Sequence, residues 1–172
     1  AITYTWDGTY NAPWSDAKWS DGVNSAINWV NSASNDAVVN DGYVYADLAN
    51  QVSANSLTIG DGIGTAGSTE VKSSATNAFW NIASITINSD GALTGGGNMT
   101  THLRLITLNG GTIGGGDNGG NAATYGVFNF DDTVHVTANS TISTTGGGVT
   151  LGQTGGTQFN VDNGATLSVT GI

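Results

Sequence analysis

The sequence predicts an all-β fold: a single-stranded parallel β-helix (solenoid) with coils of about 21 residues and an aromatic-rich N-terminal cap. Three observations carry this prediction. The 172 residues include 27 glycines and one proline, and they are rich in Ser, Thr and Asn, a composition that disfavours helices. A short phrase of alternating apolar and polar residues recurs after residue 55. Four of the five tryptophans fall within residues 1–54.

Residues 1–54 are predicted to form an N-terminal strand and an aromatic cap. Ile2, Tyr4 and Trp6 alternate with threonines, which is typical of a strand, and an Asp-Gly pair then marks a turn. The first repeat of a solenoid exposes apolar surface unless large side chains cover it, and tryptophans are suited to that role. A second strand around Tyr43–Tyr45 leads into residues 55–172, where we expect the coils of one continuous domain.

The recurring phrase predicts the coils. A β-branched residue, Leu or Phe alternates with Thr, Ser or Asn, and the middle copies start 21 or 22 residues apart. A second phrase, 91–97, recurs at 111–116, so we expect at least two strands per coil with Gly at the corners. The residues expected to point inward are Leu57, Ile59, Ile85, Ile87, Ile106, Leu108, Phe128, Phe130, Val149 and Leu151.

The polar residue inside each copy is predicted to point outward. One ladder of hydroxyl and amide groups should then run along the same face of the coils. Such a regular face is a candidate surface for repetitive ligands such as glycans, although threonine is also favoured on exposed strands by propensity alone. The ladder residues are Thr58, Thr86, Thr107, Asn129 and Thr150.

Several motifs in the first 60 residues carry a family resemblance. Thr5-Trp6-Asp7-Gly8, Trp14-Ser15, Lys18-Trp19-Ser20 and Asn55-Ser56-Leu57-Thr58-Ile59-Gly60 resemble the start of bacterial autotransporter-associated β-strand repeat proteins and related pectin-lyase-like β-helix surface proteins. The later residues are similar only in style. The resemblance implies export and display at a cell surface, and it supplies no catalytic residue. It would make the chain secreted, anchored by a partner or part of something longer.

Charge and composition exclude several classes of partner. Three basic residues stand against thirteen acidic ones, a net charge of −10, so the chain lacks the cations that bind nucleic acid or anionic membrane surfaces. No segment is apolar enough to insert in a membrane. There is no cysteine, and the sequence begins Ala-Ile-Thr-Tyr. We expect an extracellular or cell-surface chain whose signal peptide has been removed.

The acidic residues predict turns and no catalytic site. Several of them stand in Asp-Gly pairs, which are typical of turns, as are the Asn-Gly pairs of the chain. A polysaccharide-cleaving enzyme would need converging acids and bases, for which Asp131, Asp132, Asp162, His135 and Arg104 are the candidates. One Asp in the glycine-rich run Gly115–Gly120 is too few for calcium, and His102 and His135 have no metal-ligand spacing. We expect no cofactor and no metal.

The leading hypothesis for function is a non-enzymatic secreted structural subunit of a surface or matrix fibre. The last strand phrase, 167–170, is followed by no cap, so its edge could pair with the first strand of another copy, head to tail. The partner is then the chain itself. The alternative is a glycan-binding or adhesive module whose partner is a surface polysaccharide, and the third is a polysaccharide lyase or hydrolase. The predicted assembly interface comprises Ile2, Tyr4, Trp6, Leu167, Val169 and Ile172.

Overall fold

The computed structural model describes residues 1–95, 99–115, 126–143, 149–150 and 158–170. Among them every regular element is a β-strand, and none forms a helix, so the all-β prediction is confirmed. No described helix is long and apolar enough to cross a membrane. The strands form three sheets of eight, seven and three strands.

The eight-stranded sheet and the seven-stranded sheet receive alternate strands of the chain. The eight-stranded sheet has the order β17-β14-β11-β8-β6-β4-β1-β3. Its strands are β1 (Thr3–Trp6), β3 (Trp19–Ser20), β4 (Asp36–Val39), β6 (Ser53–Ile59), β8 (Asn81–Asn88), β11 (Leu105–Asn109), β14 (Val134–Ala138) and β17 (Phe159–Val161).

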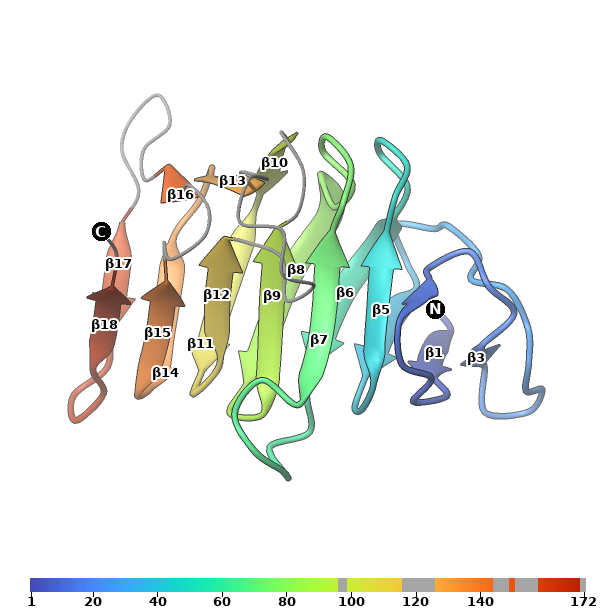
Figure 1. Cartoon of the computed structure of the whole chain (residues 1–172), viewed down its shortest axis with the longest axis horizontal. Coiled ribbons are helices and arrows are strands. Elements are labelled where there is room, and N and C mark those ends of the chain that lie inside the picture. The colour runs from blue at the N-terminus through green and yellow to red at the C-terminus, as the bar shows by residue number, and fades with distance from the viewer. Residues whose placement is uncertain (96–98, 116–125, 144–148, 151–157, 171–172) are drawn as a thin grey trace.

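The seven-stranded sheet has the order β18-β15-β12-β9-β7-β5-β2. In Figure 1 its strands from β5 to β18 point the same way and follow one another from the N-terminal to the C-terminal side. Its strands are β2 (Ala12–Pro13), β5 (Tyr43–Ala46), β7 (Thr69–Ser73), β9 (Gly91–Gly95), β12 (Thr112–Gly115), β15 (Ser140–Ser143) and β18 (Leu167–Thr170).

The three-stranded sheet consists of β10 (Met99–Leu103), β13 (Gly126–Phe130) and β16 (Val149–Thr150), each of which follows a strand of the seven-stranded sheet. All strand pairs are parallel except that of β1 with β3. Parallel pairing requires a long connection between partners, and here the chain makes it by passing through the other sheets.

Rows of like side chains form the core between the sheets. Leu57, Ile85, Ile106 and Val134 are successive partners in the eight-stranded sheet, and each is at most 2% exposed. The facing row of the seven-stranded sheet is also fully buried and joins the same core cluster; it comprises Val44, Val71, Leu93, Ile113 and Ile142. The alternation of apolar and polar residues thus places one face of each strand inside.

The predicted order of inward residues is wrong after Leu108. Phe128 and Phe130 are buried, but they lie in β13, beside Thr101 and Leu103 of β10. The partner of Ile106 in the next strand is Val134, because the chain forms an additional strand before it returns to the eight-stranded sheet. The backbone of Val149 pairs with Phe128, and Leu151 lies outside the described residues. Copies of the recurring phrase that look alike in the sequence therefore lie in strands of different sheets.

The N-terminal end holds a cluster of aromatic rings. Trp14 and Trp19 are buried, with ring centroids 4.6 Å apart. Trp29 contacts both at 5.7 and 5.4 Å, and Trp6 contacts Trp19 at 5.2 Å. Their edge-on and tilted geometries are the favourable ones for aromatic pairs. Trp6 belongs to β1 and Trp19 to β3, the last two strands of the eight-stranded sheet on this side (Figure 1).

Candidate functional site

The first predicted assembly segment is not a free strand edge. β1 pairs with β4 on one side and with β3 on the other, where Thr5 and Trp6 face Ser20 and Trp19. Tyr4 and Trp6 are 4% and 3% exposed, so a partner could not reach their side chains. Ile2, at 44% exposed, is the accessible member of this first segment. The prediction failed because nothing in the sequence indicated an antiparallel return of the chain beside β1.

The second predicted segment does lie at an edge. β18 pairs only with β15 and β17 only with β14 among the described strands. Val169 is 55% exposed and Leu167 is half-buried, while Ile172 lies outside the described residues. Val161, which was not predicted, is 45% exposed on β17. Val161 ends an apolar-polar-apolar triplet, 159–161, which has the same pattern as Val134–Val136. This pattern is the signal that could have identified it.

Each of these exposed valines terminates a buried row. Val161 is the partner of Val136 and Val169 the partner of Ile142, and both of those inner side chains are fully buried. The exposed valines therefore occupy inward positions of the sheets, and no strand that the structure describes covers them. Their exposure places apolar surface at the outer edges of β17 and β18.

The predicted outward ladder is two rows on different sheets. Thr58, Thr86 and Thr107 are successive partners in the eight-stranded sheet, as predicted, but the row continues with His135. Asn129 and Thr150 pair with each other in the three-stranded sheet, where His102 is the next partner of Asn129. The single five-residue ladder is thus wrong, for the same reason as the inward order. Three threonines in line remain.

The candidate catalytic acids hold neighbouring strands together. Asp131 accepts a hydrogen bond from Nδ1 of His102 at 2.9 Å, which joins the ends of β10 and β13. Asp162 contacts Nε2 of His135 at 2.8 Å, just after β17 and within β14. Asp132 accepts the backbone N–H of Thr133 at 2.7 Å. Each carboxylate has a partner of its own. Asp131 and Asp132 both follow β13 of the three-stranded sheet, whereas Asp162 follows β17 of the eight-stranded sheet.

The remaining site predictions concern Arg104 and metals. The guanidinium of Arg104 lies 5.5 Å from the ring centroid of Trp80, a cation–π contact. Trp80 in turn packs edge-on against His102, the partner of Asp131, with ring centroids 5.0 Å apart. Of the glycine-rich run 115–120, where we expect no calcium site, only Gly115 falls within the described residues. In the part of the chain that the structure describes, no three His, Asp or Glu side chains gather where a metal ion could bind.

Shifted carboxyl groups occur at the N-terminal half of the chain. The Ser56 hydroxyl, at 2.6 Å, and then the Asn55 amide, at 2.9 Å, donate to Asp36 and hold the pKa of that carboxyl below its ordinary value, against a small opposing effect of burial. These bonds link β4 to β6, the next strand of the sheet. Asp36 is thus explained by a structural role, as an electrostatic and hydrogen-bonded link between strands.

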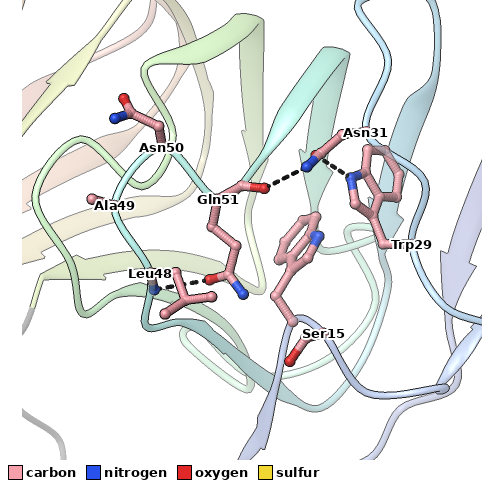
Figure 2. Close-up of a pocket in the computed structure, with 8 residues that line it drawn as sticks. Ser15, Trp29, Asn31, Leu48, Ala49, Asn50 and Gln51 are labelled. Carbon is pink, nitrogen blue, oxygen red and sulfur yellow. Dashed lines mark hydrogen bonds between the residues drawn. The ribbon is translucent and has the colours of Figure 1, made fainter.

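A pocket that is lined entirely by described residues lies beside the aromatic cluster. Its volume is about 340 Å³, and it is open to solvent (Figure 2). Residues of three separate segments line it, and none of them is charged: Trp14, Ser15, Trp29, Asn31, Leu48, Ala49, Asn50 and Gln51.

Hydrogen bonds fix one wall of this pocket. The indole N–H of Trp29 donates to Asn31 Oδ1 at 2.8 Å, and the Asn31 amide donates to the backbone oxygen of Gln51 at 2.8 Å. Gln51 Oε1 in turn accepts the backbone N–H of Leu48 at 3.2 Å, as Figure 2 shows. Asn50 has a positive φ of 53°, a conformation that Asn tolerates, and it turns the chain between Leu48 and Gln51.

Trp14 gives the pocket an unusual donor. The residue is 1% exposed. Its Nε1 is buried and has no hydrogen-bond partner among the described residues. By contrast, Nε1 of the adjacent Trp19 donates to the backbone oxygen of Trp14 at 3.0 Å. Sequence reasoning missed this pocket. The concentration of tryptophans in residues 1–54 was its only signal, and it indicated a cap.

Comparison with known proteins adds no relative. No family model matches the chain, and no curated protein and no solved structure is significantly similar to it. The residues and their geometry therefore carry the functional argument alone.

Proposed function

We propose that the protein is a non-enzymatic, exported structural module folded as a parallel β-helix, and that it associates with a second copy of itself through the outer edges of β17 and β18. The helical path is supported by the regular return of the chain to the same two sheets, with successive partners such as Leu57 and Ile85 in matching positions. The aromatic cluster is the cap at one end of this helix, and the other end adds strands.

The exposed ends of the buried rows carry this proposal. Val161 and Val169 are in register with fully buried side chains, yet they are 45% and 55% exposed. A further layer of strands, added at the outer edges of β17 and β18, would bury both side chains. Edges of this kind recruit another chain unless a protein blunts them.

The two ends of the molecule differ in a way that selects the partner surface. At the N-terminal end the outer strands β2 and β3 have two residues each, and β2 contains Pro13. Short strands and proline are devices that blunt a sheet edge. Identical molecules would therefore pair by their open edges, C-terminal end to C-terminal end. The head-to-tail fibre expected from the sequence would require β3 to be displaced from β1.

Sedimentation velocity over a range of protein concentrations tests this function, with electron microscopy of the same samples. We expect a reversible dimer, and the double variant Val161→Lys, Val169→Lys should remain monomeric. The control is Ile63→Lys, at an apolar residue that is 80% exposed and distant in sequence from the edges. Added lysines reduce a net charge of −10, so weakened association could not be attributed to greater repulsion.

A wild-type chain that stays monomeric at high concentration would overturn the proposed association. Filaments in place of dimers would restore the head-to-tail arrangement. Export is tested separately by labelling intact cells of the source with a reagent that does not enter them. An unlabelled protein in such cells would contradict the extracellular placement.

A further inference from the structure

We infer that the pocket beside the aromatic cluster is a binding site for a neutral saccharide. This goes beyond the structural role, because the pocket lies at the N-terminal end, whereas the proposed contact uses β17 and β18. It also differs from a glycan surface on the outward threonines, none of which lines the pocket.

The unpaired indole N–H of Trp14 is the first reason. Buried donors in folded proteins nearly always have a partner, and one without a partner calls for an explanation. Trp14 is 1% exposed and is one of the residues that line the pocket. In the proposed complex an acceptor of the bound ligand takes the hydrogen bond of its Nε1. The ligand must therefore carry an oxygen acceptor that can be desolvated easily, such as a sugar hydroxyl or ring oxygen.

The chemistry of the lining is the second reason. The partly buried indole of Trp29 and the exposed side chain of Leu48 offer apolar surface, on which the C–H face of a sugar ring can pack. Around them lie the hydroxyl of Ser15 and the side-chain amides of Asn50 and Gln51, which both donate and accept. Aromatic surface combined with a few polar groups that fix orientation is the usual composition of a small-molecule site.

The absence of charge from the lining selects the class of saccharide. None of the eight residues is Asp, Glu, Lys, Arg or His. An acidic sugar would find no cation to pair with, and it would enter a molecule of net charge −10. A pocket of about 340 Å³ is at the small end of ligand sites, so one or two sugar units are the appropriate size.

The wall is already in place without a ligand. Trp29, Asn31 and Gln51 are held by a chain of hydrogen bonds from one segment to the next. Asn31 Oδ1 also accepts the backbone N–H of Ser53 at 2.8 Å, at the start of β6. Binding therefore needs little ordering of these residues, which favours affinity.

The experiment is a titration of the whole chain with neutral oligosaccharides built from glucose, galactose, mannose and N-acetylglucosamine. Tryptophan fluorescence reports binding, because two indoles line the pocket, and calorimetry measures affinity. Uronic-acid and sulfated oligosaccharides serve as the charged counterpart. We expect saturable binding of at least one neutral saccharide and none of the charged ones.

Two variants locate the binding. Trp14→Phe removes the indole N–H and keeps an aromatic ring, and it should weaken binding about tenfold, the effect of one hydrogen bond. Because Trp14 belongs to the buried core cluster, the smaller ring leaves a cavity and should lower the melting temperature, so binding is measured at a temperature at which circular dichroism shows the variant to be folded. Gln51→Ala should also weaken binding. Trp80→Phe and Gln158→Ala are the matched controls outside the pocket, and their affinity should equal that of the wild type.

Three results would overturn the inference. One is the absence of binding to any neutral saccharide at millimolar concentration. Another is equal binding of neutral and acidic saccharides. The last is unchanged affinity in Trp14→Phe and Gln51→Ala when circular dichroism shows both to be folded. A failure of the proposed dimer would leave this inference intact, since the two tests use different residues.

Discussion

Two valines of one row allow the open edge to be tested by a single type of substitution. Val136 on β14 and Val161 on β17 are register partners, but the first is fully buried and the second is 45% exposed. Val136→Ala removes about 1.6 kcal/mol of transfer free energy, and the cavity left in the core raises the cost to about 2.5 kcal/mol. Val161→Ala removes roughly half of the transfer free energy and leaves no enclosed cavity, so about 0.9 kcal/mol is expected.

Urea unfolding followed by circular dichroism measures both free energies of unfolding. At low protein concentration the two costs should differ by about 1.5 kcal/mol, which corresponds to a few degrees in melting temperature. At high concentration the cost of Val161→Ala should rise, because association buries Val161, whereas the cost of Val136→Ala should not change. Equal costs for the two variants at low concentration would refute the reasoning that the row ends exposed at β17.

Three further predictions concern carboxylates. Asp90 is fully buried and accepts the backbone N–H of Gly62 at 2.7 Å, so Asp90→Ala should lower the free energy of unfolding by about 3 kcal/mol in a urea titration, against less than about 1 kcal/mol for the exposed Asp61→Ala. Because the pKa of Asp36 is lowered in the folded chain, its carboxylate stabilises the fold above the ordinary Asp pKa, and this stability is lost as the pH falls through the lowered value. In Asp36→Asn, the free energy of unfolding should therefore depend less on pH below about pH 4. Parallel pH curves for the variant and the wild type would contradict the link between strands. Asp131→Asn with Asp132→Asn should leave any polysaccharide-cleaving activity of a purified sample unchanged, and a loss of such activity would revive the enzyme hypothesis.

The all-β fold was accessible from the sequence because its signals are local. Alternation of apolar and polar residues over a few positions determines which side chains face inward, and Leu57, Ile85 and Ile106 follow that rule in matching positions. Composition indicated strands, because glycine and the small polar residues destabilise helices. Neither argument requires knowledge of which strands are neighbours.

Strand partnership was less accessible, because it depends on the path between strands. The phrases at Phe128 and Val134 are similar in pattern, yet one lies beside β10 and the other beside β11. One additional strand in the path of the chain moves the next copy of the phrase to another sheet, while the residues of that copy look the same. The pairing of β3 with β1 was missed for a related reason, because an antiparallel strand of two residues leaves almost no trace in the residue pattern.

The pocket was not predictable from any motif. Its walls come from three segments whose proximity exists only in the folded chain, and its unpaired donor is a property of what surrounds Trp14. Val161 is likewise exposed because β17 is the outermost described strand of its sheet, and not because of its residue type. The residues with the most functional interest are thus those whose surroundings differ from what their local pattern implies.

Unequal connections between strictly aligned strands make this architecture a platform for display. Between β4 and β5 the chain uses three residues, 40–42, whereas between β6 and β7 it uses nine, 60–68, while β4 still pairs with β6 and β5 with β7 in continuous register. Ile63, at the exposed part of the longer connection, contributes little to the core. Foreign peptides grafted there would be presented at a known position along a rigid scaffold, and several such sites could be spaced by whole strands.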